Sequence, residues 1–299
     1  VGKTTLLQEA QKRGRSYVTL DDLGMRLAAQ QDPAGFIDRL QLPVLIDEVQ
    51  YAPELFPYIK MVVDKSRQNG RFWLTGSQQF DMMKNVGESL AGRVEIIEMG
   101  GFDLGELSTG ASHALWLRGG FPRSFLAGSE EDSWEWRKQF VRKFLERDLG
   151  QLGFRMSPQV MGRFWTMVSH YHGQIWNGSE IAASMGISHQ SARNYLDALE
   201  QTFMVRRLLP WFVNVGKRLV KSPKLYVRDS GLFHSLLGIG SYEFLLGNPK
   251  IGASWEGFAL EQILARLPKM DAWFWGTQGG AELDLLIQPD GKRIGFEFK

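Results

Sequence analysis

The first residues of the chain carry side chains that could bind phosphate. Residues 1–5 read Val-Gly-Lys-Thr-Thr, which is the second half of the pattern G-x-x-x-x-G-K-[ST] that holds the phosphates of ATP. In the complete pattern backbone N–H groups surround the phosphates, Lys3 would reach the β and γ oxygens, and Thr4 would ligate Mg²⁺ at a helix N-terminus. With Gly2 and Thr5 as further binding residues, this segment predicts ATP and Mg²⁺ as ligands.

Two acids at the end of an apolar run could complete this chemistry. Residues 42–48 read Leu-Pro-Val-Leu-Ile-Asp-Glu, the pattern of a buried strand that ends in two carboxylates. Asp47 would then lie beside the Mg²⁺ held by Thr4, and Glu48 would polarise the attacking water. Taken singly, Lys3 could be a surface lysine, and the acids could be an ordinary strand end or the start of a helix. Taken together, the two segments predict ATP hydrolysis.

The segment after residue 71 could sense the γ-phosphate of the nucleotide. Residues 72–77 read Phe-Trp-Leu-Thr-Gly-Ser and predict a strand with a polar end. Thr75, Ser77 or Gln78 could face the phosphate from that end. A Thr-Gly-Ser turn also forms without any ligand, so a purely structural turn stays open as the alternative.

One arginine could stabilise the charge that builds up during phosphoryl transfer. Arg93 ends the run Ser89–Arg93 and precedes a predicted strand over Val94–Glu98. An arginine finger acts on the transferred phosphoryl group in this way. The alternative is an arginine at a helix end that pairs with an acid.

A second chemical pattern lies near the C-terminus. Residues 282–287 predict a strand that contains Asp284, and Glu297 and Lys299 lie on another predicted strand. Side chains two apart on a strand share a face, so Glu297 could converge with Asp284 on one Mg²⁺ if the strands are neighbours. Lys299 would then orient or activate the water that attacks a phosphodiester.

A helix that begins near Trp255 could add a further carboxylate to this pattern, from Glu256 or alternatively from Glu261. The Asp and Glu-x-Lys arrangement resembles the PD-(D/E)XK nuclease fold. An acid and a lysine that alternate on a strand also occur on solvated faces. A decayed form of the nuclease fold, or one that binds without cutting, would show the same residue pattern. The neighbouring apolar residues alternate as a half-buried sheet requires: Leu283, Leu285, Phe296 and Phe298.

The middle of the chain has the proportions of a helix-turn-helix. Residues 179–188 and 191–200 predict two helices, with Gly186 in the turn and Ser188 as the cap of the second helix. The apolar residues Ile181, Met185, Ile187, Leu196 and Leu199 would face the core.

The second of these helices could meet DNA, because Gln190, Arg193 and Asn194 fall where a recognition helix contacts bases. Phe203–Leu209 and Lys217–Val220 could pair as a wing, with Lys217 and Arg218 as further DNA contacts. Residues 174–224 hold seven Lys or Arg against three acids, a net charge of +4, which favours DNA. Packing, protein contacts or a solvated basic face are the alternatives.

These residues need a scaffold, and the sequence predicts one. Short apolar runs alternate with helical patterns up to about Leu107, which indicates a parallel sheet flanked by helices. Strands are predicted over 17–20 and 43–47 and a helix over 55–63, and two amphipathic helices over 134–149 and 160–170 would connect this part to the helix-turn-helix.

The order of six motifs is similar to that of the AAA-superfamily ATPases of bacteria and archaea that carry a C-terminal domain of unknown function. The motifs are Lys3-Thr4-Thr5, Leu20-Asp21-Asp22, Ile46–Gln50, Leu74–Gln78, Leu90–Arg93 and Gly119–Pro122. The resemblance covers nearly the whole chain. It implies an α/β P-loop NTPase domain in which Asp47, Glu48 and Arg93 have the roles given above, followed by a winged helix and a small α/β nuclease-like domain. The chain departs from the family in lacking the front of the phosphate-binding loop.

Length and composition limit the other possibilities. A chain of 299 residues is expected to form two or three domains, and 43% hydrophobic with 23% charged residues is typical of globular proteins. The chain has no cysteine, which excludes disulfides and cysteine metal sites and leads us to expect a reducing, cytoplasmic location. No apolar run reaches about eighteen residues, so we expect no membrane span.

We therefore predict an ATPase domain over residues 1–110, a helical connector over 111–172, a winged helix over 173–228 and a nuclease-like domain over 229–299. Both ends interrupt predicted elements, so we treat the chain as a fragment and expect it to bind nucleotide weakly by itself.

The leading hypothesis for function is an ATPase whose nucleotide cycle controls a DNA-directed C-terminal module. One alternative is an ATP-dependent switch that binds DNA or a protein partner without cutting. Another is a Mg²⁺-dependent nuclease with a vestigial nucleotide site. The net charge of +2 neither requires nor excludes nucleic acid, and an oligomer is compatible with all three hypotheses.

Overall fold

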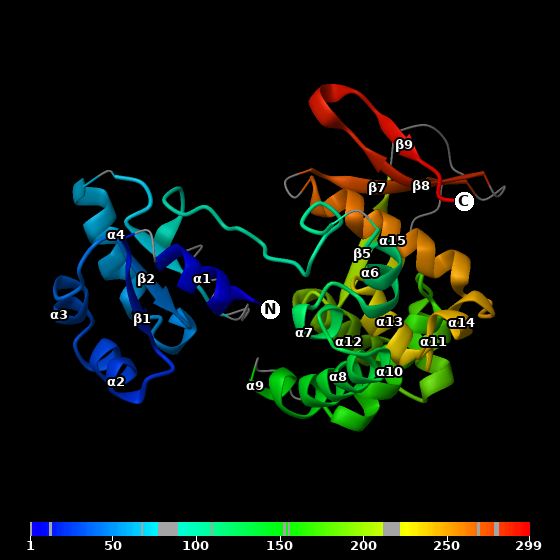
Figure 1. Cartoon of the computed structure of the whole chain (residues 1–299), viewed down its shortest axis with the longest axis horizontal. Coiled ribbons are helices and arrows are strands. Elements are labelled where there is room, and N and C mark those ends of the chain that lie inside the picture. Colours follow the sequence, from blue (N-terminus) through cyan, green and yellow to red (C-terminus); the bar gives the residue numbers. More distant parts are fainter. Residues whose placement is uncertain are drawn as a thin grey trace. The chain divides into compact units, whose positions relative to one another are not determined.

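The chain folds into two compact units, Val1–Met99 and Gly100–Lys299 (Figure 1). The computed structural model describes residues 2–11, 14–66, 68–76, 89–108, 110–151, 154, 156–211, 222–267, 270–277 and 281–299. Among the helices in these ranges, none is long and apolar enough to cross a membrane.

The N-terminal unit is built on a sheet of three parallel strands in the order β1-β2-β3. The strands are β1 (Ser16–Thr19), β2 (Val44–Asp47) and β3 (Phe72–Leu74). Ile46 lies between Val18 and Leu74. Every residue of β2 is buried, as expected for the central strand of a parallel sheet. The predicted α/β character of this part of the chain is confirmed.

Helices surround this sheet and share its core. They are α1 (Lys3–Gln11), α2 (Leu23–Gln31), α3 (Pro33–Asp38), a 3₁₀ turn (Val49–Tyr51) and α4 (Leu55–Ser66). Asp22 and Asp32 cap α2 and α3, because their carboxylates accept the backbone N–H groups of Met25 and Gly35. The core consists of Leu20, Ala29, Phe36, Ile37, Val44, Ile46, Val49, Ala52, Leu55, Phe56, Ile59 and Leu90.

The strand predicted over Val94–Glu98 is not formed. Residues 94–100 have neither helical nor strand structure, and Ile96 and Ile97 are exposed. A strand needs backbone hydrogen bonds from a neighbour, and the described part of the N-terminal sheet ends at β1 and β3 without including this segment. The prediction of a strand at Val94–Glu98 was therefore wrong: the segment is rich in β-branched residues, but it does not join the described sheet.

The C-terminal unit begins with a helical layer. It contains α6 (Ser112–Arg118), α7 (Pro122–Phe125), α8 (Glu130–Lys143) and α10 (Pro158–His170). Helix α8 runs on through a π-helical turn (Phe144–Asp148) into α9 (Leu149–Gln151). The two connecting helices that the sequence predicts are thus present, with somewhat different bounds.

The helix-turn-helix is confirmed as α11 (Gly178–Met185) and α12 (His189–Gln201). Gly186 ends α11 with a φ of 64°, a left-handed conformation that glycine adopts without strain. The Ser188 hydroxyl caps α12 by accepting the Ser191 N–H at 3.0 Å. Ile181, Leu196 and Leu199 are buried and Met185 and Ile187 pack against them, as predicted.

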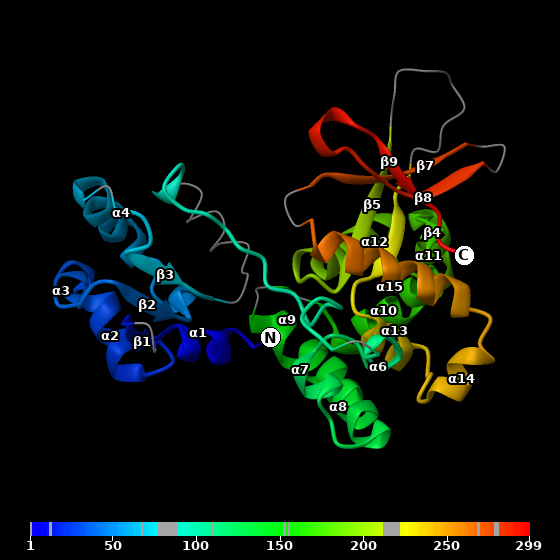
Figure 2. The same cartoon turned by 45° about the horizontal axis from the view of Figure 1, so that its top comes forward.

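A mixed sheet of six strands, in the order β4-β6-β5-β7-β8-β9, joins the helix-turn-helix to the C-terminal region (Figure 2). The strands are β4 (Gln174–Ile175), β5 (Val205–Pro210), β6 (Lys224–Val227), β7 (Ala272–Gly276), β8 (Glu282–Ile287) and β9 (Ile294–Phe296). Helices α13 (Ser230–Leu236), α14 (Tyr242–Leu246) and α15 (Ile251–Ala265) connect its two halves.

Strand β5 takes part in both halves of this sheet. Its residues 205–208 pair antiparallel with β6, and Leu209 and Pro210 pair parallel with β7. The wing was predicted to pair this strand with Lys217–Val220, and residues 217–220 lie outside the described part of the chain. Among the described residues, the antiparallel partner of β5 is β6 at residues 224–227. Strand β9 is shorter than predicted, because Glu297 and Lys299 follow its end at Phe296.

A close junction of glycines explains the Gly119–Pro122 motif. The Asp229 carboxylate accepts the Gly120 N–H at 2.8 Å and also caps α13 through the Leu232 N–H at 2.8 Å. A Cβ atom on Gly231 would lie 2.1 Å from the carbonyl oxygen of Arg118. The motif therefore joins helices α6, α7 and α13, and its part in the described structure is packing.

Candidate functional site

The carboxylate of Asp47 is held at the C-terminal end of β2. Asp47 is 3% exposed, and the Tyr17 hydroxyl donates to its Oδ2 atom at 3.0 Å. The Thr75 hydroxyl donates to its Oδ1 atom. Parallel strands place their C-terminal ends at one edge, so side chains from β1, β2 and the end of β3 meet here. Burial is the main cause that raises the pKa of Tyr17, and the Asp47 carboxylate raises this pKa further. Tyr17 therefore stays a hydrogen-bond donor.

Lys3 reaches the same edge of the sheet from the N-terminus of α1. Its Nζ atom donates to the carbonyl oxygen of Gly76 at 2.5 Å, and Gly76 follows Thr75, which binds Asp47. Lys3 and Asp47 therefore contact two consecutive residues, Gly76 and Thr75, just beyond the end of β3. Of the other predicted binding residues, Gly2 has a φ of 78°. Thr5 is exposed, whereas the side chain of Thr4 and all of Ser77 and Gln78 lie outside what the structure describes.

Glu48 occupies a strained turn directly after Asp47. Its φ of 58° lies in the left-handed region, which non-glycine residues seldom adopt and which recurs at functional sites. The Gln50 side chain donates to the Glu48 carboxylate, and the Val49 N–H donates to the Thr75 carbonyl at 2.9 Å. The left-handed turn and the Gln50 amide thus hold Glu48 directly after the buried Asp47.

Arg93 is engaged elsewhere in the N-terminal unit. Its Nε atom lies 2.5 Å from Oδ1 of Asp64 on α4, and its Nη2 atom lies 3.2 Å from Oδ2. A further bond from Nη1 reaches the Ala91 carbonyl at 2.9 Å. This is the helix-end ion pair that the sequence left open as the alternative, and the arginine-finger role stays a prediction.

The residues around β2 fit a magnesium nucleotide. Mg²⁺ prefers oxygen ligands and usually binds through one or two carboxylates together with phosphates. Asp47 offers a carboxylate at the C-terminal end of β2, and Lys3 binds the residue after the Thr75 that holds this carboxylate. Sequence reasoning missed Tyr17. The available signal was the two-residue spacing of Tyr17 and Thr19, which puts two hydroxyl groups on one face of the strand before the Asp21-Asp22 pair.

The C-terminal acids fall into two separate groups. Glu256 on α15 and Asp284 on β8 both contact the Lys224 ammonium, at 3.1 and 3.3 Å. Glu297 and Lys299 pair with each other at 3.2 Å, and the Lys299 side chain is 82% exposed. The condition that this site required, neighbouring strands, is met for β8 and β9, but Glu297 and Lys299 follow the end of β9 at Phe296.

The described residues offer no metal site of three or more His, Asp or Glu side chains. Glu261, the alternative helix acid, is instead paired with Arg206 at 2.5 Å and with Arg228 at 3.4 Å. Burial would raise the pKa of Glu261, but the two arginines outweigh burial and lower it. This carboxylate is therefore a charged partner of the two arginines.

An irregularity in β8 lies next to Asp284. Trp273 of β7 pairs with Leu286, whereas Trp275 pairs with Leu283, so two steps along β7 correspond to three along β8. Such a bulge changes the direction of nearby side chains. Asp284 uses both oxygens, since Oδ1 contacts Lys224 and Oδ2 accepts the Phe298 N–H at 2.9 Å.

The predicted DNA-reading residues of α12 form an exposed polar stripe. Gln190, Arg193 and Asn194 are exposed, and the Gln190 amide donates to Asn194 at 2.8 Å. Arg207 does not add to this stripe, because it pairs with Asp197 at 2.6 Å and with Glu200. Lys217 and Arg218 lie outside the described residues.

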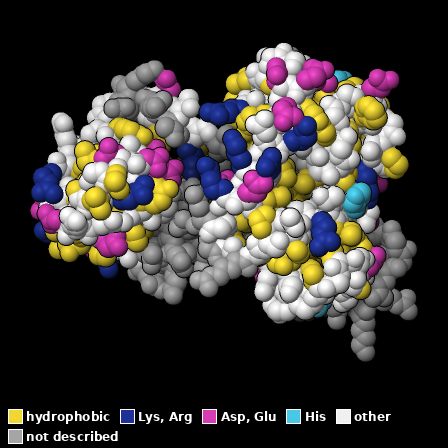
Figure 3. Space-filling view, turned by 90° about the horizontal axis from the view of Figure 1, so that it is seen from below, with side chains coloured by type: hydrophobic (Ala, Val, Ile, Leu, Met, Phe, Trp, Pro, Cys, Tyr) yellow, Lys and Arg dark blue, Asp and Glu magenta, His cyan; other side chains and the backbone are white. Residues whose placement is uncertain are grey.

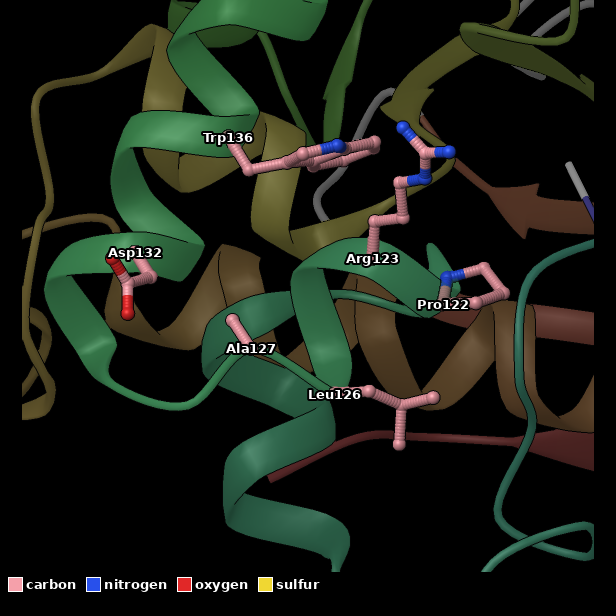
Figure 4. Close-up of a pocket in the computed structure, with 6 residues that line it drawn as sticks. All are labelled: Pro122, Arg123, Leu126, Ala127, Asp132 and Trp136. Atoms are coloured by element: carbon pink, nitrogen blue, oxygen red, sulfur yellow. The ribbon is translucent and has the colours of Figure 1, made fainter.

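A shallow pocket of about 510 Å³ lies between the α7 segment and α8 (Figure 4). None of the residues predicted for nucleotide, DNA or metal binding lines it. Its lining residues are Pro122, Arg123, Leu126, Ala127, Asp132 and Trp136. On the face of the C-terminal unit seen in Figure 3, hydrophobic side chains lie among charged groups of both signs.

Comparison with known protein families matches three successive segments of the chain. The family model described as "AAA domain" matches residues 1–108. Two domains of unknown function follow, DUF8612 over residues 110–243 and DUF4143 over residues 251–299.

Two mycobacterial proteins resemble the whole chain. The uncharacterized protein Rv2008c of Mycobacterium tuberculosis is 45% identical over 298 residues, covering 100% of this chain and 68% of the relative. The uncharacterized protein Mb2031c of Mycobacterium bovis shows the same identity and coverage. No solved structure matches the chain significantly.

Proposed function

Because this chain belongs to the family of the mycobacterial proteins Rv2008c and Mb2031c and its residues 1–108 match an AAA domain, we propose that its N-terminal unit binds and hydrolyses ATP. One observation supports this above the others. Lys3 binds Gly76 and Asp47 binds Thr75, so a phosphate-binding cation and a magnesium-binding carboxylate meet at one edge of the sheet.

Each residue has a specific task in this proposal. Lys3 binds the β- and γ-phosphates while backbone groups of Gly2 and Thr5 complete the cradle. Thr4 and Asp47 hold Mg²⁺, which neutralises negative charge on the phosphates when it is bound. Glu48, oriented by Gln50, polarises the attacking water. Ser77 lies near the γ-phosphate in this proposal, and Arg93 contacts it only if its pairing with Asp64 is exchanged.

ATP hydrolysis by the full-length protein tests the proposal with two variants that should fail differently. Lys3→Ala removes the phosphate-facing charge, so we expect nucleotide binding to be lost. Glu48→Gln keeps the site but removes the water-polarising group, so binding should persist while kcat falls by about 10²–10⁴-fold. Phosphate release and titration calorimetry measure the two effects.

Lys65→Ala is the matched control, because Lys65 is an exposed lysine of the same unit in the last turn of α4. It should hydrolyse ATP like the wild type. Equal hydrolysis by the wild type and Lys3→Ala would refute the proposal.

The exposed stripe of α12 supports a second element of the function, in which the nucleotide cycle controls binding of double-stranded DNA. Gln190, Arg193 and Asn194 offer donors and acceptors of the kind that read base edges. The charge of Arg193 would also displace counterions from the DNA backbone. An ATP-dependent switch that binds a protein partner through the same stripe is the alternative.

Fluorescence anisotropy with duplex DNA separates these two forms of the switch. For DNA binding we expect affinity that falls with salt and drops about 5- to 100-fold in Arg193→Ala, as one base-contacting arginine contributes about 1–3 kcal/mol. Arg142→Ala on α8, an exposed arginine paired with Glu146, should bind like the wild type. Absence of binding at low salt, with or without ATP, would favour a protein partner.

Three further proposals rest on the sequence. They are the domain boundaries after residues 110, 172 and 228, a cytoplasmic location inferred from the lack of cysteine, and assembly into an oligomer.

A further inference from the structure

Lys224 is a buried lysine at the centre of the C-terminal acidic cluster. Its side chain is 5% exposed, and β6, which carries it, is buried at every position. The Nζ atom lies 3.1 Å from Glu256 Oε1 and 3.3 Å from Asp284 Oδ1, and it also contacts Glu282. An ammonium has three donors, so each can be directed at one of the three carboxylates.

The remaining groups of this cluster are also engaged. The Tyr226 hydroxyl donates to Oε1 of Glu256 at 2.5 Å, and the Phe298 N–H donates to Oδ2 of Asp284 at 2.9 Å. The ring of Phe274 lies 5.7 Å from the Lys224 Nζ. Asp284 and Glu256, two of the acids that the nuclease resemblance offers to Mg²⁺, are therefore bound to donors of the chain itself.

The charge of Lys224 is matched by its surroundings, since its Nζ atom contacts the carboxylates of Glu256, Glu282 and Asp284. A buried ammonium is stable in a protein only when its charge is compensated, and here three carboxylates compensate it.

We propose that the Lys224 ammonium is the resident cation of this cluster and takes the place of a divalent metal ion between Glu256 and Asp284. A magnesium or manganese ion at this point would lie against the ammonium and face strong repulsion from it. The residues present therefore do not fit the Mg²⁺ that a PD-(D/E)XK nuclease requires. Glu297 and Lys299 do not restore such a site, because they pair with each other in solvent.

Two consequences follow for the molecule. The C-terminal region is charge-balanced without metal, so it holds its structure in the absence of Mg²⁺. It also lacks metal-dependent phosphodiester cleavage, which favours the non-cleaving forms of the protein. Neither consequence depends on ATP hydrolysis by the N-terminal unit.

Mn²⁺ binding tests the proposal, and it is measured as the loss of the electron paramagnetic resonance signal of free Mn²⁺. The full-length protein is used without nucleotide and with Asp47→Asn, which removes the metal-binding carboxylate of the other unit. In this background we expect no Mn²⁺ site that depends on Asp284. Adding Lys224→Met should create one Mn²⁺ site, with an affinity at least tenfold higher than that of the protein that keeps Lys224. Adding Asp284→Asn to this variant should abolish the site again.

Lys250→Met is the control, since Lys250 lies in the same unit and donates to the His170 carbonyl instead of to a carboxylate. It should gain no Mn²⁺ site. Lys224→Arg should fold and should also gain none, because it keeps the positive charge.

Two results would overturn the proposal. The first is a folded Lys224→Met protein, verified by circular dichroism, that gains no Asp284-dependent Mn²⁺ site. The second is Mn²⁺ binding, or Mg²⁺-dependent plasmid nicking, by the protein with Lys224 present that disappears in Asp284→Asn. The second comparison does not involve Lys224→Met, so it decides the question even if that variant does not fold.

Discussion

The hydroxyl group of Tyr17 connects β1 to the candidate magnesium ligand on β2. It donates to one oxygen of Asp47 while Thr75 donates to the other. The carboxylate is thus oriented before any metal is bound. Groups that hold a metal ligand in place contribute to metal affinity without touching the metal, so Tyr17 is a positioning residue in the proposed ATPase.

Tyr17→Phe should therefore raise the Mg²⁺ concentration that ATP hydrolysis requires, with a smaller effect on folding. A hydrogen bond to a charged group contributes about 1.5–3 kcal/mol, so the Mg²⁺ concentration for half-maximal hydrolysis should rise at least tenfold. Magnesium titration of ATP hydrolysis measures this change. Tyr58→Phe, at a half-buried tyrosine of α4, is the control, and an unchanged Mg²⁺ dependence in Tyr17→Phe would refute the positioning role.

Two buried histidines make the C-terminal unit sensitive to acid. His234 donates from Nδ1 to the Leu117 carbonyl and accepts the Ser254 hydroxyl at Nε2. His172 accepts the Val227 N–H at Nδ1. Burial lowers the pKa of His172 to about 3 and that of His234 to about 4, because neither ring can take up a charge among its neighbours.

Between these values and the ordinary histidine pKa of about 6.5, the unfolded chain binds more protons than the folded one. Each histidine therefore contributes its full stability above about pH 6.5, and the contribution falls by up to about 1.4 kcal/mol per pH unit below it. Denaturation of the protein between pH 7 and pH 4.5 measures the slope. His234→Gln should flatten it and the exposed His170→Gln should not; equal stability throughout would contradict the assignment.

At the level of residues, the sequence was sufficient where a motif fixes both type and spacing. Lys3 and Asp47 could be found from such motifs. Tyr17 was missed, because its spacing from Thr19 is a weak signal and a tyrosine in a strand is equally typical of a core. Lys224 was also missed as a cluster residue, since its acidic partners are distant in sequence and come from α15 and β8.

Among the elements, those predicted correctly depend on local signals. Helix α12 begins at Ser188 because a serine hydroxyl caps the N-terminus, and α11 ends at Gly186 because glycine tolerates a positive φ. Strand partners are set by distant parts of the chain, which explains the error at residues 94–98. This segment is rich in β-branched residues, yet the described N-terminal sheet does not include it. For the same reason, the pairing of β5 with residues 224–227 could not be predicted from local signals.

The glycine junction at α13 gives a prediction at this scale. A Cβ atom on Gly231 would meet the Arg118 carbonyl oxygen at 2.1 Å, and backbone cannot move aside as a flexible side chain can. Gly231→Ala should cost about 1–3 kcal/mol of unfolding free energy. Gly252→Ala in α15, where nothing lies within 4 Å, should be neutral or stabilise by up to about 1 kcal/mol. Urea denaturation compares the two, and similar stabilities would contradict the packing role.

The molecule as a whole consists of two compact units, and ligands should act on them separately. We expect calorimetry of the full-length protein to resolve the melting of Val1–Met99 from that of Gly100–Lys299. Mg²⁺ and ATP at about 100 times Kd should stabilise only the nucleotide-binding unit, by about 2.7 kcal/mol. Lys3→Ala should abolish this shift, and a shift confined to the C-terminal unit would place the nucleotide elsewhere.

The sheet that β5 completes crosses the border between the two matched domains of unknown function. Lys224 lies in the segment that ends at residue 243, whereas Glu256, Glu282 and Asp284 lie in the segment that begins at residue 251. A chimera that exchanged one segment with a relative would therefore have to bring a matching lysine or matching acids with it. Otherwise it would leave either a buried ammonium without its carboxylates or the carboxylates of Glu256, Glu282 and Asp284 without their cation, so the two segments are best transplanted together.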